Sequence, residues 1–473
     1  MKINKRNFLL TLMYAIVVLI CNIFIFSTGN DESYELCKIG VISVVEFLIF
    51  TVINTKINGK FLNYAMIFCS TLYVFNFGQV IIYTFFKNIY PHVRFILLLE
   101  KKDAIHGFQW MSLAFFIICL SILFSCIRSK KDHFIKESSR SLDNYIKLSK
   151  KIILFTFPVK LIIDIFCLIV SISSGGLIAR IWMNSVPYVF VTYGKISLVG
   201  FAMLIVSLKN NPKYQKKVFL FIILYILVMM VSGIRSENVG YLLVFIFLFF
   251  SSQNTRIPIF LVIIYGVLGI LLLAFIIAVG KFRGAEKSFS SFVEIFMNNL
   301  TKNNVILSLF DTCGDTGYTT QEVINKWLPY YGCTHGDSFY IGWISIIPNI
   351  PKLFTLPGDL TAKTYFALRL QQSGILNKNY TNIGGSLLGE LFFNFGLFGG
   401  VIASIVVGIL IGWVSKKVTK ITEGYDYNFM ITTIPIMFAT IYWVRSYFGA
   451  EFRLIIWATV FILLIKKTKF KKK

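Results

Sequence analysis

The stretch FLLTLMYAIVVLICNIFIFS occupies residues 8–27 and contains no charged side chain. About 20 apolar residues in an α-helix are enough to cross the roughly 30 Å hydrocarbon core of a bilayer. The basic sequence MKINKR precedes this stretch, as in a signal peptide, but no small-residue cleavage site follows it and further apolar stretches do. We therefore interpret residues 8–27 as a retained first membrane span.

Apolar runs of similar length recur along the 473-residue chain, which is 56% hydrophobic and 15% charged. Soluble proteins have about 25% charged residues. The pattern predicts an all-α polytopic membrane protein with about twelve transmembrane helices and one large extracytoplasmic loop. A re-entrant pair at 218–233 and 239–252 is the alternative that would shift the topology after it. The predicted spans are residues 8–27, 39–54, 61–83, 105–127, 152–172, 194–208, 218–233, 239–252, 258–280, 386–414, 428–444 and 454–465.

The formal net charge of +25 raises the question of nucleic-acid binding. The basic residues, however, stand in short clusters between apolar runs, such as KNNPKYQKK at 209–217 and KKTKFKKK at 466–473. Clusters of this kind mark the cytoplasmic side of a membrane protein. The distribution predicts that both termini are cytoplasmic and that nucleic acid is not a partner.

One connection, about residues 281–385, is predicted to lie on the opposite side of the membrane. It is rich in Asp, Gly, Pro and Tyr and is far longer than an ordinary loop, which indicates a functional loop or a small folded cap. We therefore expect three parts: a transmembrane bundle of nine spans (1–280), this periplasmic loop or cap (281–385), and the last three spans with a basic cytoplasmic tail (386–473).

Two of the 8 cysteines, Cys313 and Cys333, fall in this loop. In an oxidising compartment a disulfide between them would close a loop of about 20 residues and stabilise a cap by about 3 kcal/mol. We expect this disulfide. CxxC and His-rich patterns are absent, and no metal site is expected from 4 histidines.

Arginine next to the outer end of a span is unusual, because the topology rule disfavours it there. Three segments show it: GIRSENVG at 233–240, GKFRG at 280–284 and VRSYFGAEFR at 444–453. The guanidinium group forms bidentate hydrogen bonds with phosphate, so the three together predict a site for an anionic, lipid-borne diphosphate. Alternatively, each arginine reaches the lipid headgroups or pairs with a nearby carboxylate. The charged residues of these segments are Arg235, Glu237, Lys281, Arg283, Arg445, Glu451 and Arg453.

The segment TNIGGSLLGELFFNFGLFGG (381–400) begins a predicted span and yet carries polar residues. Ser386, Glu390 and Asn394 follow one another at i, i+4 and i+8, so they share one face of a helix. Polar groups in lipid are costly, and this face is therefore expected to point into the protein or into a watery cavity. Glu390 either acts toward the substrate or pairs with an outer arginine in a glycine-rich packing helix.

Two other features of the predicted spans have structural interpretations. Gly396 and Gly400 match the small-xxx-small spacing that allows close helix approach. Glu46 is a further intramembrane charge, and Lys160 and Asp164 stand at i, i+4, where we expect them to pair with each other.

Two motifs resemble those of a known family. The large loop ends in GGSLLGELFFNFGLFGG (384–400), and an arginine stands well upstream in SGIRSENVGYLLVF (232–245). Together they resemble the O-antigen polysaccharide polymerases of the Wzy type, over roughly the second half of the chain. These polymerases are also described by paired R-x10-G patterns in outer loops. Arg235, Arg283 and Arg445 lack that spacing, so a pair of substrate-binding loops is not carried over.

The resemblance implies an enzyme of the bacterial inner membrane that joins undecaprenyl-diphosphate-linked oligosaccharide repeat units into O-antigen or capsular polysaccharide at the periplasmic face. Arginines would stabilise the departing diphosphate without a metal or other cofactor. The attacking hydroxyl would lose its proton to a carboxylate or a histidine. Asn394, Glu237 and the cationic residues above are candidates for substrate binding. The candidate bases are Glu390, Glu237, Asp337 and His335, the last two within THGDS at 334–338.

The implied partners are the lipid-linked oligosaccharide, the membrane and, in the same pathway, a chain-length regulator and a flippase. Two alternatives stay open. An O-antigen ligase shares the topology and the donor but uses lipid A-core as acceptor. A flippase or other transporter of the same glycan would spread charges through many spans and relate its two halves by a repeat, whereas here the charges gather at one predicted face.

Overall fold

A computed structural model describes most of the chain, and all regular structure in the described residues is helical. This confirms the predicted all-α class for that part of the protein. The described residues are 4–27, 29–90, 93, 99–127, 139–174, 182–183, 186–231, 235–253, 271, 274–275, 278, 293–298, 304–347, 369–370 and 385–470.

The chain divides into two compact units, each built from segments that are distant in sequence. Unit 1 comprises residues 1–134, 310–419 and 439–453, and unit 2 comprises residues 135–309, 420–438 and 454–473. Helices from the beginning, the middle and the end of the chain therefore pack together within unit 1.

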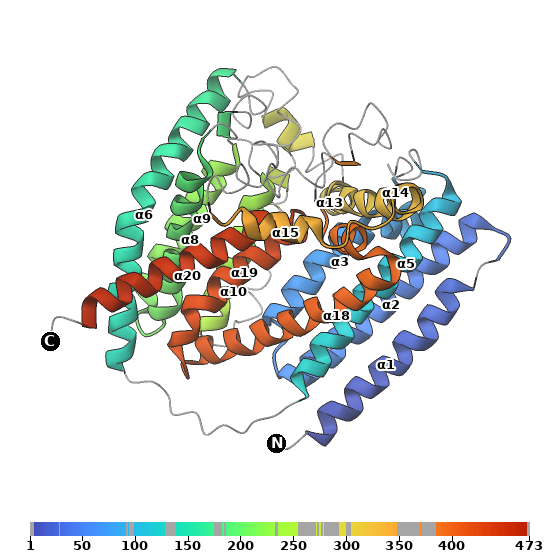
Figure 1. Cartoon of the computed structure of the whole chain (residues 1–473), viewed down its shortest axis with the longest axis horizontal. Helices are drawn as coiled ribbons and strands as arrows, with labels where there is room; N and C mark the ends of the chain where they lie inside the picture. The colour runs from blue at the N-terminus through green and yellow to red at the C-terminus, as the bar shows by residue number, and fades with distance from the viewer. Residues whose placement is uncertain are drawn as a thin grey trace. The chain divides into compact units, whose positions relative to one another are not determined.

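Four helices from the N-terminal part of the chain lie in unit 1 (Figure 1): α1 (Lys5–Phe26), α2 (Glu32–Asn58), α3 (Tyr64–Phe86) and α5 (Lys101–Cys126). Three of them begin where a polar side chain accepts a hydrogen bond from the first-turn backbone, the usual device for satisfying those N–H groups. The capping residues are Asn4, Asp31 and Asn63.

Unit 2 contains α6 (Ser139–Ser174), α8 (Tyr188–Ser207), α9 (Pro212–Val231) and α10 (Arg235–Ser252). The late helices contribute residues to both units. They are α18 (Leu387–Glu423), α19 (Met430–Trp443) and α20 (Phe448–Phe470), and a short 3-10 helix (Tyr427–Phe429) lies in unit 2.

Within the described residues, seven helices are long and apolar enough to span a bilayer, which supports a multi-pass membrane protein. Helices α9, α10, α19 and α20 cover further predicted spans, whereas 258–280 falls almost wholly outside the described residues, so the number twelve stays a prediction. The seven helices are Lys5–Phe26, Glu32–Asn58, Tyr64–Phe86, Lys101–Cys126, Leu142–Ser171, Tyr188–Ser207 and Leu387–Glu423.

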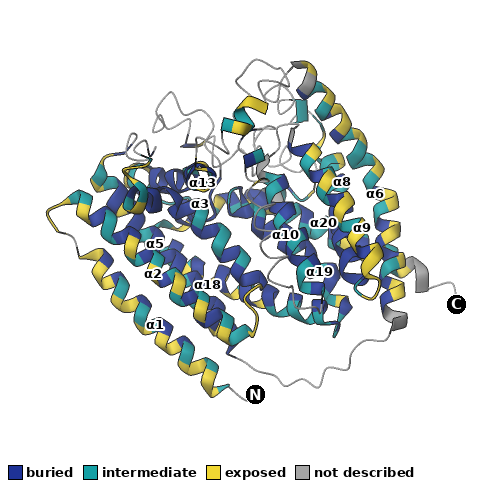
Figure 2. Ribbon diagram, turned by 180° about the vertical axis from the view of Figure 1, so that it is seen from behind, coloured by how far each residue is buried: buried dark blue, intermediate teal, exposed yellow. Residues whose placement is uncertain are grey.

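Helix α1 shows the burial pattern of a lipid-facing span. Tyr14 and Ile25 are fully buried, whereas Leu19 and Ile23 on the opposite side are each 62% exposed. Figure 2 shows exposed residues along the whole length of α1. Large apolar side chains are unfavourable against water but not against lipid tails, so this pattern supports a helix at the edge of a membrane bundle.

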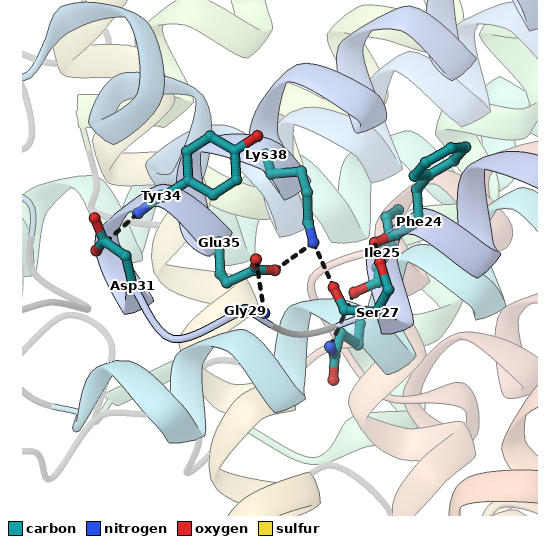
Figure 3. A network of polar contacts seen from close by, with 9 residues as sticks. Phe24, Ile25, Ser27, Gly29, Asp31, Tyr34, Glu35 and Lys38 are labelled. Atoms are coloured by element: carbon teal, nitrogen blue, oxygen red, sulfur yellow. Dashed lines mark hydrogen bonds and ion pairs between the residues drawn. The ribbon is translucent and has the colours of Figure 1, made fainter.

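The turn between α1 and α2 is held by a polar network (Figure 3). The Lys38 ammonium lies 2.5 Å from the Glu35 carboxylate and donates to the Ser27 carbonyl, which ends α1. Glu35 also accepts a hydrogen bond from the Gly29 N–H at 3.0 Å. Both charges are thus satisfied within the turn, which keeps the adjoining ends of α1 and α2 together.

The middle of the predicted 281–385 loop is helical and packs into unit 1. Thr316–Ile324 are buried without interruption, and an added Cβ at Gly317 would lie 2.4 Å from the Asn76 carbonyl of α3. Glycine is needed there because the two backbones touch. The described helices of this region are α13 (Val305–Glu322), a π-helix (Val323–Trp327), α14 (Leu328–Tyr331) and α15 (Asp337–Ile344).

Candidate functional site

The polar stripe of Ser386, Glu390 and Asn394 does not face lipid. All three side chains lie in unit 1 with 0% relative exposure. Residues 385–394 are buried without interruption, whereas exposed positions begin at Phe395 and recur along the rest of α18. The prediction of an inward-facing stripe is confirmed, because the first turns of α18 are enclosed by protein.

Helix α18 is broken at Gly396, whose backbone angles are φ 72° and ψ −175°. This conformation is open essentially only to glycine. The break interrupts the helical hydrogen-bond ladder, and the Phe393 carbonyl accepts instead from the Thr334 backbone N–H at 3.0 Å. Gly396 therefore allows the segment around Thr334 to hydrogen-bond to α18 beside Asn394. This role differs from the close packing of two helices that the sequence predicted for Gly396.

Glu390 accepts three hydrogen bonds, all from uncharged donors. Its Oε1 accepts from Ser338 Oγ at 2.6 Å. Its Oε2 accepts from the Trp443 indole Nε1–H at 2.6 Å and from the Phe448 backbone N–H at 2.9 Å. The donors come from α15, from the end of α19 and from the start of α20, so one carboxylate ties three segments to α18. Hydrogen bonds of this kind offset the cost of burying a charged or polar group.

Asn394 and Ser338 join α15 to α18. Asn394 Oδ1 accepts from the Ser338 N–H at 3.1 Å and from Thr334 Oγ1 at 3.2 Å. Asn394 Nδ2 donates to Ser338 Oγ at 2.8 Å and to the Glu390 carbonyl at 2.7 Å. Ser338 stands in the first turn of α15, where backbone N–H groups have no acceptor within the helix. The Asn394 side chain supplies that acceptor, so it positions the start of α15.

Ser386 connects the other end of the stripe to α13. Its Oγ accepts from the Gly389 N–H at 3.2 Å, which caps α18. The same Oγ shares a hydrogen bond of 2.7 Å with the buried Thr320 hydroxyl of α13. The three polar residues of α18 therefore hold α13 and α15 against its first turns.

Two of the predicted bases, His335 in the turn before α15 and Asp337 at its first position, are both exposed. His335 has φ 53°, a left-handed conformation that is uncommon for residues other than glycine. Asp337 begins α15, and its N–H donates to the Thr334 carbonyl at 3.2 Å. His335 follows Thr334 and Asp337 precedes Ser338, and Asn394 is hydrogen-bonded to both Thr334 and Ser338. Asn394 therefore positions the segment that carries both candidate bases.

The predicted disulfide between Cys313 and Cys333 is not formed in the structure. Cys313 lies on α13, which is docked on α3, whereas Cys333 lies beside the break in α18. Cys333 contacts a histidine instead, with its Sγ 3.6 Å from His335 Nδ1. The sequence interval allowed the disulfide, but α13 holds Cys313 against α3, whereas Cys333 lies in the connection between α14 and α15.

Two of the predicted outer arginines lie in unit 1. The Arg445 guanidinium is 5.7 Å from the centre of the Phe75 ring, in the turn that follows α19. The same turn contacts the start of α18, because the Leu387 N–H donates to the Val444 carbonyl at 3.4 Å. Arg453 Nε donates to the Ser345 carbonyl at 2.8 Å, at the end of α15.

Glu390 is hydrogen-bonded to Ser338, Trp443 and Phe448 and not to Arg445 or Arg453. Among the described residues, the expected alternative of an ion pair between Glu390 and an outer arginine is therefore not formed. The other cationic candidates cannot be placed. The side chains of Arg235 and Glu451, together with Lys281 and Arg283, lie outside the described residues. The shared arginine site therefore stays a prediction.

Glu237 lies in unit 2, where it forms an ion pair with Lys195 and accepts a hydrogen bond from the Tyr241 hydroxyl. The expected pair of Lys160 and Asp164 is confirmed at 2.9 Å. Lys195 was missed by sequence reasoning, although a lysine inside the predicted span 194–208 is the kind of intramembrane charge that marks a partner.

Glu46 is fully buried in α2, and neither carboxylate oxygen has a hydrogen-bond partner in the described part of the chain. Within the same residues no group of three or more His, Cys, Asp or Glu side chains could hold a metal ion. Glu46 therefore takes no part in joining the described helices through hydrogen bonds, unlike Glu390 and Asn394.

A family model described as O-antigen polysaccharide polymerase Wzy matches residues 9–473. No curated protein and no solved structure matches the chain. The family match extends over essentially the whole chain, beyond the half that the two sequence motifs cover.

Proposed function

The chain belongs to the O-antigen polysaccharide polymerase Wzy family, and on this premise we propose that it joins undecaprenyl-diphosphate-linked oligosaccharide repeat units at the periplasmic face of the inner membrane. The family match over residues 9–473 is the observation that carries the proposal. The helices that are long and apolar enough to span a bilayer support its multi-pass placement.

The proposed reaction is a glycosyl transfer. A hydroxyl oxygen of the incoming unit attacks the anomeric carbon of the donor glycan and forms the new C–O bond. The bond from that carbon to the diphosphate oxygen breaks, and undecaprenyl diphosphate leaves with the electron pair. The hydroxyl proton passes to a base, and the negative charge on the leaving group needs nearby cations or hydrogen-bond donors.

We assign the base to the turn before α15. His335 and Asp337 are exposed and can reach a bound substrate. Glu390 is enclosed, and each of its carboxylate oxygens already accepts a hydrogen bond. We therefore give Glu390 and Asn394 a positioning role: together with Ser338 they hold the turn that presents the two candidate bases.

The cationic candidates for the diphosphate remain those of the three arginine segments. Arg445 supports this proposal, because it stands in the turn whose Val444 carbonyl accepts from the Leu387 N–H at the start of α18, in the same unit as Glu390. Arginine suits this role because its planar fork binds phosphate in a bidentate manner. The proposed diphosphate-binding residues are Arg235, Lys281, Arg283, Arg445 and Arg453.

The proposed orientation places both termini in the cytoplasm. It rests on the basic clusters in alternate connections and in the C-terminal tail. In this orientation the 281–385 segment, including α13 and α15, lies on the periplasmic side with the Glu390 cluster.

Deletion of the gene, followed by electrophoresis of lipopolysaccharide, tests the activity. Loss of a polymerase leaves lipid A-core with a single repeat unit and no ladder, and a plasmid-borne copy restores the ladder. Bare core, with polymer still on the lipid carrier, would instead identify a ligase. An unchanged ladder would contradict both activities.

A further inference from the structure

Cys333 and His335 form a close pair of a thiol and an imidazole in the turn before α15. The Cys333 Sγ lies 3.6 Å from His335 Nδ1 and 4.0 Å from Nε2, so both ring nitrogens are close to the sulfur. A neutral imidazole always has one nitrogen that accepts a proton. Either tautomer of His335 therefore offers the thiol an acceptor.

The hydrogen bonds of the intervening residue, Thr334, hold this pair in place. The residue between the two, Thr334, is bonded to α18 through its N–H to the Phe393 carbonyl at 3.0 Å and through its hydroxyl to Asn394 Oδ1 at 3.2 Å. The left-handed backbone of His335 turns the chain so that its side chain returns toward Cys333. The arrangement is thus a built feature of unit 1.

The pair is also accessible. Cys333 is partly exposed and His335 is exposed, unlike Cys69, Cys119 and Cys167, which are buried in membrane helices. A thiol reacts through its thiolate, so reactivity requires access and a group that takes the proton. The Cys333 site satisfies both requirements.

We propose that Cys333 is a modification site for small disulfide compounds, with His335 as the base that accepts the thiol proton. The Cys333 sulfur attacks one sulfur of the compound, and a new S–S bond forms while the S–S bond of the compound breaks. The second half of the compound leaves as a thiolate and takes up the proton from His335. Atoms and electrons balance without any further oxidant.

The modification has a structural consequence that rests on the proposed function. A Cβ at Gly396 would lie 3.8 Å from the Cys333 Cβ, so the sulfur is next to the break in α18. An adduct there needs space between the turn and α18, and it moves the turn that presents His335 and Asp337. Modified protein should therefore lose polymerase activity, and reduction of the mixed disulfide should restore it.

The test measures adduct formation at Cys333 in the purified full-length protein, with dithiodipyridine as the disulfide and peptide-level mass spectrometry as the readout. The decisive variant is His335→Asn, because asparagine tolerates a left-handed backbone but has no basic nitrogen. A free thiol is only a few per cent ionised at pH 7, so loss of the base should slow the reaction by about tenfold. Tyr330→Ala, at a residue that is 79% exposed, is the matched surface control and should leave the rate unchanged.

Two outcomes would overturn the pairing of Cys333 with His335. One is an equal or faster rate at Cys333 in His335→Asn, since local unfolding exposes the thiol and cannot slow it. The other is a reaction at Cys313 in the same wild-type sample that is as fast as the reaction at Cys333.

A second measurement separates this site from the proposed activity. Polymer formation from lipid-linked repeat units in membrane vesicles should stop after the disulfide treatment, and dithiothreitol should restore it. Cys333→Ser protein should keep working in the presence of the compound. Fast, His335-dependent labelling without polymer from any variant would leave the modification site intact and contradict the polymerase. Polymer formation that continues with Cys333 fully modified would contradict the regulatory consequence.

Discussion

Replacement of Glu390 by Gln and by Ala distinguishes a positioning carboxylate from a catalytic base. In Glu390→Gln the amide can turn its oxygen toward Trp443 and Phe448 and keep both of those hydrogen bonds. Its NH2 group then faces Ser338 Oγ, which accepts because a hydroxyl has two lone pairs. Each of the three contacts of the carboxylate is therefore retained, with the direction of one reversed, and the only donor that loses its acceptor is the Ser338 hydroxyl.

The magnitude follows from the donors left behind. Glu390→Gln weakens charge-assisted hydrogen bonds to neutral ones and relieves the burial of a charge, so the net cost should be about 1 kcal/mol or less. Glu390→Ala leaves the Trp443 indole N–H, the Phe448 N–H and the Ser338 hydroxyl without this acceptor. At roughly 1–3 kcal/mol for each donor that loses its acceptor, the expected destabilisation is about 3–9 kcal/mol.

The assay is electrophoresis of lipopolysaccharide from a deletion strain that carries each variant. The abundance of each protein and its melting temperature in detergent are measured in parallel. We expect Glu390→Gln to retain a shortened or weaker ladder at normal abundance. Glu390→Ala should lose both the ladder and several degrees of melting temperature. Glu46→Gln is the matched control, because Glu46 is buried in the same unit without hydrogen-bond partners, so its replacement removes no hydrogen bond to another segment.

Complete loss of polymer in Glu390→Gln, at wild-type abundance and melting temperature, would refute this reasoning. It would mean that the carboxylate takes a proton during the reaction and that its hydrogen bonds rearrange when substrate binds. A normal ladder from Glu390→Ala would refute it from the other side and leave Glu390 with a structural role that the fold can lose.

Three further predictions test the site, the helix break and the topology. Gly396→Ala should cost about 1–3 kcal/mol, because its backbone angles are essentially restricted to glycine; an unchanged melting temperature would show that α18 is continuous. Arg445→Lys keeps the charge but loses the planar fork, so polymer synthesis should fall by about tenfold or more at normal abundance; a wild-type ladder would remove Arg445 from the diphosphate site. Asp337→Cys, in a background without other cysteines, should react with a membrane-impermeant thiol reagent from the periplasm. Labelling only after the cytoplasmic side is opened would reverse the proposed orientation.

The membrane class, the inward-facing stripe and one ion pair could be predicted from local sequence alone. Uncharged runs of about 20 residues have one stable arrangement in lipid, a helix whose backbone groups pair with one another. The spacing of Ser386, Glu390 and Asn394 is a property of a single helix, as is the pairing of Lys160 with Asp164. For such features the interacting positions lie within a few residues, and helical geometry determines their contacts.

The partners of Glu390 were decided only by the tertiary structure. Its donors, Ser338, Trp443 and Phe448, lie 52, 53 and 58 residues away in sequence, on segments that no local pattern brings to α18. The absence of a disulfide was decided in the same way, because the interval between Cys313 and Cys333 allowed one, whereas the docking of α13 on α3 keeps Cys313 apart from Cys333. Sequence spacing determines which side of a helix a residue occupies, because neighbouring residues share one backbone geometry. Which group meets that side depends on how distant segments pack, and here that packing surrounds the carboxylate with uncharged donors rather than with the arginines that the sequence offered.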